Sequence, residues 1–551
     1  MRDEGQPPSM KQIFSPATVL ILALAALVVP VAVIEYYVLR HTGGTFVYPL
    51  DDTFIHMALA RNLSFHGVWG MNPYEFASAS SSVLYTLLLA GLFKVFSVKV
   101  VIPFVVNCIV AVFLLAVVRR WLEKQGISGW GQLVLLLGVI FFTPLPILVV
   151  CGMEHGLQCL FSFLFIIGFS EWLAGGERDR LPWRVVVYGM MVTFIRYEGL
   201  FLVGIACLML AYYRKWGLAF RLGAISVLPL VVFGIWSVAK GSYFLPNSVL
   251  LKSGGAPLSI GGMMHWLDAV FVQKLTVVKT DGLPAGTPRP GISLLATQRL
   301  LIILPLVYLA FLKYVRQRAS YGFIFILLLA CTLLQLCFAS TGWLYRYEAY
   351  LVFCSTVIVG VLVWKYGREA MRGSAVIVRW MLVAVVFAAA FPFVLRSAAA
   401  FSKTGSACVN IYQQQYQMGS FLHTYYDRGV NAVNDIGAVS YLTDGANIDL
   451  WGLGNIKVAR SKKGGYWTPG FLDSLCGAQH AGTAIVYEKW FSDSLLHRWT
   501  KVATWGIANN VICGDDTVSF FSIRPADAPV LKKNLQEFEP RLPAGVLVKY
   551  Y

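Results

Sequence analysis

The stretch that decides the fold of this chain is "TFVYPLDDTFIHMALARNL", residues 45–63. It follows an apolar run long enough to cross a membrane, and it carries two adjacent acids, Asp51 and Asp52. The apolar side chains after them are interrupted by His56 and Arg61, so this segment is too polar to span a bilayer. Its two-sided character predicts an amphipathic helix that lies in the membrane interface. Two adjacent acids after an apolar run call for an explanation, because acidic residues are few in this chain.

Composition places the rest of the chain in a membrane. The chain has 551 residues, of which 57% are hydrophobic and only 13% are charged, and its mean hydropathy is +0.66. A soluble protein of this size would not stay dispersed with so little polar surface. The apolar run at 17–39 is too long for a signal peptide and has no small-residue cleavage site after it. We therefore expect this run to be a retained span.

The net charge of +17 reports membrane topology rather than a nucleic-acid partner. The basic residues gather in short loops that begin near residues 118, 175, 212, 313 and 365. Basic loops stay on the cytoplasmic side, so the segments between them face outward. This predicts about eleven spans, with the amino end inside and the carboxyl tail outside. In this topology the apolar segment 78–97 is not a span, and we expect it to lie in the outer interface beside residues 52–66.

The last 150 or so residues have a different character. From about residue 398, short apolar runs of strand type are broken by Gly, Asn and Asp. We therefore predict a polytopic α-helical membrane domain at 1–397, with juxtamembrane helices in its first outer loop. A small extracytoplasmic α/β domain is predicted at 398–551.

The ten cysteines show no Cys/His spacing typical of a metal site. Most of them lie in apolar runs and behave as small hydrophobic residues. Cys408, Cys476 and Cys513 lie in the tail, where an extracytoplasmic location permits one disulfide, and the spacing does not determine its pairing.

In the predicted topology the scattered polar residues converge on the outer face. Any one of them has a plain explanation, because polar groups at the ends of spans cost little, and the convergence is the signal. The residues are Asp51, Asp52, His56, Arg61, Glu154, His155, Arg196, Glu198, Asn247, Lys252, Arg346 and Glu348.

The acid pair allows two interpretations. An Asp before an apolar-periodic run is commonly an N-cap, and a second Asp favours the helix dipole. Capping needs only one acid, however, and two adjacent carboxylates repel each other. In a partly dry cavity, one carboxylate of such a pair can serve as a general base.

The basic residues of the group also allow two interpretations. Arg346 in "GWLYRYEAY" suits an interface anchor among aromatic residues, and it equally suits a phosphate ligand, because a guanidinium binds phosphate with two parallel hydrogen bonds. Lys252 in "PNSVLLKSGG" carries the same two interpretations. Arg196 and Glu198 in "FIRYEGL" allow a simple ion pair, which stabilises little when exposed.

Taken in order, these motifs resemble the GT-C superfamily of membrane glycosyltransferases. The similarity is to its arabinofuranosyltransferase-like branch, which includes the mycobacterial terminal β-arabinofuranosyltransferases. The motifs that carry it are "YPLDDTFIHMALARNL", "NPYEFASASSSVLYTLLLAGLF", "CGMEHGLQCLF", "RYEGL", "LPNSVLLKSG" and "DIGAVSY…IDLWGLGN". His155 and Tyr197 stand where the branch has Thr and Pro, so the sugar stays open.

The resemblance implies an inverting glycosyltransferase at the outer face of the cytoplasmic (inner) membrane. It would move a sugar, arabinofuranose in that branch, from a polyprenyl-phosphate donor to a glycan, lipid or protein acceptor. By analogy with GT-C enzymes, Asp51 would be the general base, and Asp52 would orient it or assist the acceptor. The expected ligands of the leaving phosphate are Arg346 and Lys252, with Arg196 third.

The remaining residues of the group would bind substrate: Glu154, His155, His56, Arg61, Glu198 and Asn247. A divalent cation is an open question, since Asp51, Asp52 and Glu154 could bind one, but carboxylates alone do not establish it. No nucleotide-binding motif is visible, and we expect no nucleic-acid partner.

Three other classes of protein remain as alternatives. A lipid-linked-sugar flippase or transporter predicts ionisable residues near mid-span and an internal repeat, and neither is evident. A glycan polymerase or ligase outside the GT-C superfamily predicts dominant arginines in a large outer loop. A receptor that senses a ligand through its tail domain leaves the first-loop acids unexplained.

Overall fold

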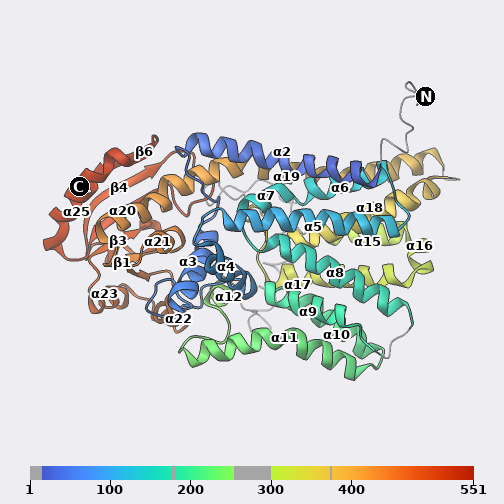
Figure 1. Ribbon diagram of the computed structural model, residues 1–551, viewed down its shortest axis with the longest axis horizontal. Coiled ribbons are helices and arrows are strands. Elements are labelled where there is room, and N and C mark those ends of the chain that lie inside the picture. Colours follow the sequence, from blue (N-terminus) through green and yellow to red (C-terminus); the bar gives the residue numbers. More distant parts are fainter. Residues whose placement is uncertain (1–14, 177–179, 253–299, 373–374) are drawn as a thin grey trace.

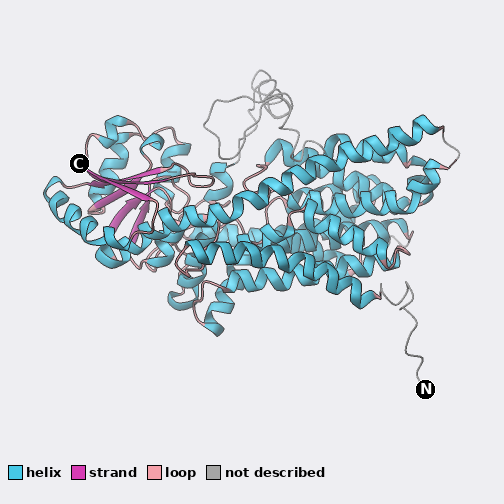
Figure 2. Ribbon diagram, turned by 90° about the horizontal axis from the view of Figure 1, so that it is seen from above, coloured by secondary structure: helices cyan, strands magenta, loops and turns pink. Residues whose placement is uncertain are grey.

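The computed structural model describes residues 15–176, 180–252, 300–372 and 375–551. A bundle of long helices forms one end of the molecule, and a smaller domain with a sheet forms the other (Figure 1). The strands are confined to this second domain (Figure 2). This arrangement confirms the predicted fold class in its coarse form, a multi-pass helical membrane domain followed by a small carboxyl-terminal domain.

Six helices of the described residues are long and apolar enough to cross a membrane, and a seventh span results if the pair α6 and α7, bent by 48°, is counted as one. The number of eleven spans therefore stays a prediction. The six helices are α2 (Pro16–His41), α5 (Ile102–Lys124), α8 (His155–Ala174), α11 (Trp216–Ala239), α17 (Ala319–Phe338) and α18 (Ala349–Met371).

The other helices of the membrane domain are shorter or lie across the bundle. They are α3 (Asp51–His66), α4 (Val83–Phe96), α6 (Trp130–Phe142), α7 (Leu145–Cys151), α9 (Trp183–Ile195), α10 (Gly199–Tyr212), α12 (Asn247–Lys252), α15 (Leu300–Ala310) and α16 (Leu312–Gln317). The long helix α19 (Val376–Ile411) runs from this domain into the next, so the expected boundary at 397/398 falls inside an unbroken helix.

The position of residues 52–66 in the membrane interface stays a prediction, but the expected exposure of one face of this helix to lipid is corrected by the structure. Helix α3 is buried along most of its length, including Phe54, Met57 and Ala58. Helix α4 packs on one side of it, and α21 (Gly437–Leu442) of the carboxyl-terminal domain packs on another. An isolated amphipathic pattern does not reveal a second protein partner, so the sequence alone assigned this surface to lipid.

The carboxyl-terminal domain is a six-stranded mixed sheet in the order β2-β1-β3-β5-β4-β6. Strand β1 (Val430–Val433) pairs in parallel with β2 (Ala446–Asp449) and β3 (Thr483–Val486). Strands β4 (Thr500–Ile507), β5 (Thr517–Ser522) and β6 (Val546–Tyr550) extend the sheet with antiparallel pairings. The α-helices around the sheet are α20 (Gln417–Tyr426), α21, α22 (Ile456–Lys463), α23 (Pro469–Ala478), α24 (Asp493–Leu496) and α25 (Ala528–Phe538). All ten cysteines lie in the described residues and are free thiols, including Cys408, Cys476 and Cys513.

Candidate functional site

The first acid of the pair joins the two domains. Asp51 begins α3, and its two carboxylate oxygens accept hydrogen bonds from the backbone N–H groups of Gly437 (2.7 Å) and Ala438 (2.8 Å) at the start of α21. A Cβ atom on Gly437 would lie 2.1 Å from the backbone oxygen of Asp51, so only glycine fits this approach. Asp51 is thus a cap, as its plain interpretation required, but it caps a helix of the other domain.

The same helix is held at its other end by Arg61. This residue lies more than two turns further along α3, and its guanidinium donates to the carbonyls of Tyr441 (2.8 Å) and Thr443 (3.0 Å). An acid at the amino end and a cation at the carboxyl end both suit the dipole of α21. Burial and the nearby Asp435 carboxylate raise the pKa of Asp51 to about 8, against the effect of its two N–H donors.

The second acid faces a different environment. Asp52 forms an ion pair through Oδ2 with Nη2 of Arg346, which is almost fully buried. Arg346 also donates from Nη2 to the hydroxyl of Tyr347 (3.0 Å), and its Nη1 lies 2.9 Å from the sulfur of Met153. Asp52 lies in the lining of two separate cavities, so this ion pair stands where they meet.

The first cavity, here called the arginine cavity, has a volume of about 260 Å³. Its lining combines two guanidinium groups with a wall of apolar side chains from α10, α12 and α17 and the segments around them. The residues are Asp52, Ser81, Met153, Arg196, Tyr197, Glu198, Leu200, Phe201, Leu245, Ser248, Val249, Phe338, Ala339, Ser340, Arg346 and Tyr347. A charged end beside an apolar wall suits a ligand that is itself a phosphate on a lipid.

The two guanidiniums of this cavity lie on the same aromatic ring. The Arg196 and Arg346 carbons Cζ are 5.5 Å and 4.9 Å from the centroid of Tyr347. Arg196 also pairs with Glu198 through two hydrogen bonds of 3.1 Å and 2.7 Å, and with Glu154 at 2.6 Å. The charges are therefore fixed before any ligand arrives.

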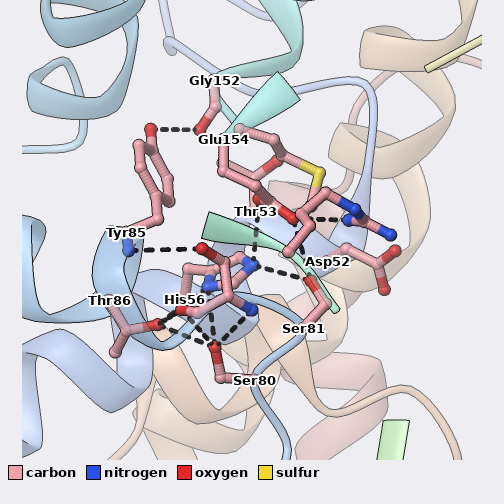
Figure 3. A network of polar contacts seen from close by, with 12 residues as sticks. Asp52, Thr53, His56, Ser80, Ser81, Tyr85, Thr86, Gly152 and Glu154 are labelled. Carbon is pink, nitrogen blue, oxygen red and sulfur yellow. Dashed lines mark hydrogen bonds and ion pairs between the residues drawn. The ribbon is translucent and has the colours of Figure 1, made fainter. Parts of the chain in front are cut away.

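Figure 3 shows a network of polar contacts that includes Asp52 and Ser81, two residues that line the arginine cavity. Glu154 accepts a hydrogen bond from Ser81 (3.1 Å), and its Oε2 lies 3.5 Å from Nε2 of His56. The other ring nitrogen of His56 is 2.9 Å from Oγ1 of Thr86. Burial lowers the pKa of His56. Burial acts to raise the pKa of Glu154, but His56, His155 and Arg196 together hold it below its usual range.

The loop that carries Arg346 and Tyr347 is held by a buried ion pair. Arg396, in the apolar helix α19, donates to Glu348 (3.0 Å) and to the carbonyl of Tyr345 (2.7 Å), and Glu348 accepts from the N–H of Gly342 (2.9 Å). Both charged side chains are fully buried. Between these anchors, three consecutive residues, 343–345, have φ angles between 52° and 58°. Each residue in the left-handed region costs about 1–2 kcal/mol, so this turn is strained. The ion pair helps to hold the turn in this conformation.

The second cavity, here called the tryptophan cavity, has a volume of about 370 Å³ and lies between the two domains. It shares Asp52, Ser340 and Tyr347 with the arginine cavity. Its other lining residues are Leu50, Asp51, Ile55, Thr341, Trp343, Ile411, Gln415, Asn434, Asp435, Ile436, Trp451, Leu453, Trp490, Ile512, Cys513 and Gly514.

The structure brings most of the expected site residues to one place. Glu198, Arg196 and Arg346 line the arginine cavity, and Glu154 and His56 lie directly behind it. His155 is also buried there, with its ring 6.2 Å from that of Tyr347.

Three expected site residues have other surroundings. Arg61 holds α21 and lines neither cavity. Asn247 donates to the carbonyl of Leu453 (3.3 Å) and so links α12 to the carboxyl-terminal domain. Lys252 is the last residue of α12, and its side chain lies outside the described part of the chain.

Several residues of the site were not expected from sequence. Arg396 had a signal, because an arginine inside the apolar helix α19 needs a partner. Asp435 stands in the quoted motif "DIGAVSY" but was assigned no role. Tyr347, Trp451 and Trp490 gave no signal, since aromatic residues are common throughout this chain.

The described residues contain no group of three or more His, Cys, Asp or Glu side chains arranged to hold a metal ion. In particular, Asp51 is engaged by two backbone N–H groups, and Asp52 by Arg346. A divalent cation does not fit this arrangement of donors among the described residues.

Fold and site together define a multi-pass membrane protein with a cavity that contains two arginine–carboxylate ion pairs, next to a small carboxyl-terminal domain. Residues 409–521 match a family described as a domain of unknown function (DUF8728). No curated protein sequence matches the chain.

The solved structures that are similar to it include the following two. ArnT from Cupriavidus metallidurans, bound to undecaprenyl phosphate, aligns with a TM-score of 0.50 and 11% identity over 92% of this chain and 98% of that chain. The apo oligosaccharyltransferase of Archaeoglobus fulgidus aligns with a TM-score of 0.51 and 11% identity over 97% of this chain and 76% of that chain. At such low identity the likeness shows the fold alone.

Proposed function

We propose that this protein is a GT-C glycosyltransferase that transfers a sugar from a polyprenyl-phosphate donor to an acceptor hydroxyl, with inversion at the anomeric carbon. The observation that carries the proposal is the Asp52–Arg346 ion pair at the meeting point of the two cavities. The fold shared with ArnT, which is bound to undecaprenyl phosphate, supports a lipid-linked donor.

The donor phosphate binds in the arginine cavity. Arg346 and Arg196 supply fixed positive charge, and the wall of Leu200, Phe201 and Phe338 accepts the first isoprenoid units. Such charge stabilises the phosphate as the glycosidic bond breaks, so the leaving group needs no proton. Lys252, expected beside Arg346 from the sequence, stays a candidate ligand, because it ends the helix α12 that contributes to this wall.

Asp52 is the general base in this proposal. We expected Asp51 from the resemblance, but both Asp51 oxygens accept backbone hydrogen bonds from α21, whereas Asp52 lies at the boundary between the cavities. When the donor phosphate binds Arg346, it takes the place of the Asp52 carboxylate on the guanidinium. Asp52 then accepts the proton of the acceptor hydroxyl as its oxygen attacks the anomeric carbon.

The remaining substrate contacts would come from the residues around the arginine cavity. Glu198, Glu154, His155 and His56 are placed to orient the sugar, directly or through Arg196 and Ser81. The site and the carboxyl-terminal domain would face the outer side of the cytoplasmic membrane, as the basic loops indicate. Arabinofuranose is the first sugar to test, and the acceptor would be a glycan, lipid or protein.

The test is transfer by the purified protein from synthetic polyprenyl-phosphate sugars, with arabinofuranose first. Asp52→Asn and Asp51→Asn are assayed beside wild type, with folding checked by thermal unfolding. Loss of a general base lowers the rate by about 10²–10⁴-fold, and we expect this for Asp52→Asn. A smaller loss is expected for Asp51→Asn, in proportion to its effect on stability.

Equal turnover in Asp52→Asn and wild type would refute the assignment of the base. Loss of transfer in a folded Asp51→Asn variant, with normal transfer in Asp52→Asn, would assign the general base to Asp51. Binding of every donor lipid without transfer would favour a flippase.

A further inference from the structure

The proposed function assigns the donor to the arginine cavity and leaves the tryptophan cavity without a ligand. The lining of the tryptophan cavity differs from that of the arginine cavity. We propose that it is the acceptor site and that it binds an uncharged saccharide, excluding acceptors that are acidic at the reacting end. This inference rests on the proposed function, because it assigns the second substrate of the same reaction.

The size and position of the cavity suit an acceptor. Its volume of about 370 Å³ falls within the range of roughly 300–1,000 Å³ that is usual for small-ligand pockets. Asp52, the proposed base, lies in its lining and also in that of the arginine cavity. A hydroxyl group held here can therefore reach the base while the anomeric carbon of the donor lies on the other side.

Aromatic rings form part of the apolar lining, beside aliphatic side chains. Trp451 and Trp490 lie with ring centroids 4.5 Å apart and tilted by 48°, and Trp343 comes from the strained turn of the membrane domain. The C–H faces of a sugar ring are apolar and pack well against an indole ring, which offers a large contact area with few rotatable bonds.

Trp451 is held in place from outside the cavity. The Lys462 Nζ atom lies 3.1 Å from the centroid of its ring and 4.5 Å from that of Trp467. The backbone N–H of Trp451 also donates to Asp449 (2.7 Å), which accepts a further bond from Gly454 (2.7 Å). Such pre-organisation lowers the entropy cost of binding a ligand against the ring.

Polar groups of the carboxyl-terminal domain complete the lining. Asp435 accepts hydrogen bonds at Oδ2 from Gln415 (2.9 Å) and from the hydroxyl of Tyr487 (2.8 Å), which orient its carboxylate. Asn434 is only 3% exposed, its Oδ1 accepts from the N–H of Tyr487, and its side chain also interacts with Asp435.

Charge selects among possible acceptors. Three carboxyl groups line the tryptophan cavity, from Asp51, Asp52 and Asp435, and no Lys, Arg or His appears among its described lining residues. A phosphate or carboxylate brought into this site would find no cation among these residues to pair with, whereas sugar hydroxyls can form hydrogen bonds with the acids.

The test is binding by the full-length protein in lipid nanodiscs, measured by saturation-transfer NMR and tryptophan fluorescence. The probes are the methyl glycosides of arabinofuranose and glucopyranose, with methyl glucuronide and methyl glucoside 6-phosphate as acidic counterparts. Undecaprenyl phosphate is titrated separately as a probe of the arginine cavity.

We expect the neutral glycosides to bind and the acidic ones to bind at least about tenfold more weakly. Trp451→Ala should weaken binding of neutral glycosides by about tenfold or more, since one aromatic contact contributes roughly this much. Trp490→Phe and Asp435→Asn should each weaken it less. The matched controls are Trp183→Ala, an exposed tryptophan on α9, and Asp473→Asn, which pairs with Arg498 on the far side of the domain.

None of these variants should change undecaprenyl phosphate binding. Equal binding of neutral and acidic glycosides would overturn the inference, as would unchanged binding in Trp451→Ala, Trp490→Phe and Asp435→Asn together. If undecaprenyl phosphate binds but no glycoside does, the acceptor site is wrong and the proposed function stands. If undecaprenyl phosphate does not bind either, the proposed function itself fails.

Discussion

The two cavities share a wall, yet their charged groups differ. The arginine cavity contains two guanidiniums, each paired with a carboxylate, beside apolar side chains, whereas the tryptophan cavity has three carboxyl groups and no basic side chain among its described lining residues. Asp52 lines both cavities, and its partner Arg346 lines only the first. In the proposed reaction, the leaving phosphate would therefore meet guanidiniums in one cavity, while the acceptor hydroxyl would approach Asp52 from the other.

The largest effect is expected from the Arg396–Glu348 ion pair, which holds the loop between the two cavities. Arg396→Leu leaves Glu348 charged and unpaired in a dry interior, which costs about 3–5 kcal/mol. The strained turn at 343–345 should relax, and both undecaprenyl phosphate and neutral glycosides should bind more weakly. Thermal unfolding and the two binding assays measure this.

The control is the double variant Arg396→Leu with Glu348→Leu. Replacing both partners of a buried ion pair is often nearly neutral, so its unfolding temperature should recover most of the loss. A single variant as stable as wild type, with both ligands bound normally, would contradict the anchoring role.

Removal of one charge should affect the ligands of the two cavities differently. Arg346→Ala should lower transfer by about 10²–10³-fold, the effect of losing one group that stabilises developing negative charge. Undecaprenyl phosphate binding should fall with it, while neutral glycosides should still bind in the tryptophan cavity. Arg346→Lys keeps the charge and should recover part of the transfer rate. If both ligands are lost together in a folded Arg346→Ala variant, the two cavities are one site.

The contact between the domains should depend on pH through Asp51. The pKa of its carboxyl group is raised from an ordinary value of 3.8 to about 8, so the folded protein holds this proton more tightly than the unfolded chain does. The resulting stabilisation is present in full below about pH 4 and is lost as the pH rises to about 8. One such group changes the free energy of unfolding by at most about 1.4 kcal/mol per pH unit.

We therefore expect the unfolding temperature to fall between pH 5 and pH 8. The fall should be smaller in Asp51→Asn, and some should remain because burial also raises the pKa of Asp435. An identical pH profile in Asp51→Asn and wild type would show that another group is responsible.

The smallest effect concerns the cap on α21. Asp51→Ala removes both acceptors of the Gly437 and Ala438 N–H groups, and the loss of a cap costs about 1 kcal/mol, within a range of 0.5–2. The free energy of unfolding measures this, and Arg61→Ala should act on the other end of the helix by a similar amount. If Asp51→Ala abolishes transfer without any change in stability, Asp51 acts in the chemistry and the two acids have been assigned the wrong way round.

The sequence by itself determined the membrane class, the small carboxyl-terminal domain and several of the charged residues that the structure brings together. Long apolar helices and short strands between turn residues are local patterns, and both the bundle and the sheet follow from them. Asp52, Arg196, Glu154 and Arg346 also stood out locally, because ionisable groups are few in such a chain and need partners.

Only the tertiary structure decided which partner each of the two acids binds. Successive residues at the start of a helix point about 100° apart, so Asp51 meets α21 while Asp52 meets Arg346. Their partners lie 386 and 294 residues away, and no local pattern connects positions so distant in the chain. For the same reason the tryptophan cavity could not be foreseen: its walls come from both domains, and it exists only where they meet.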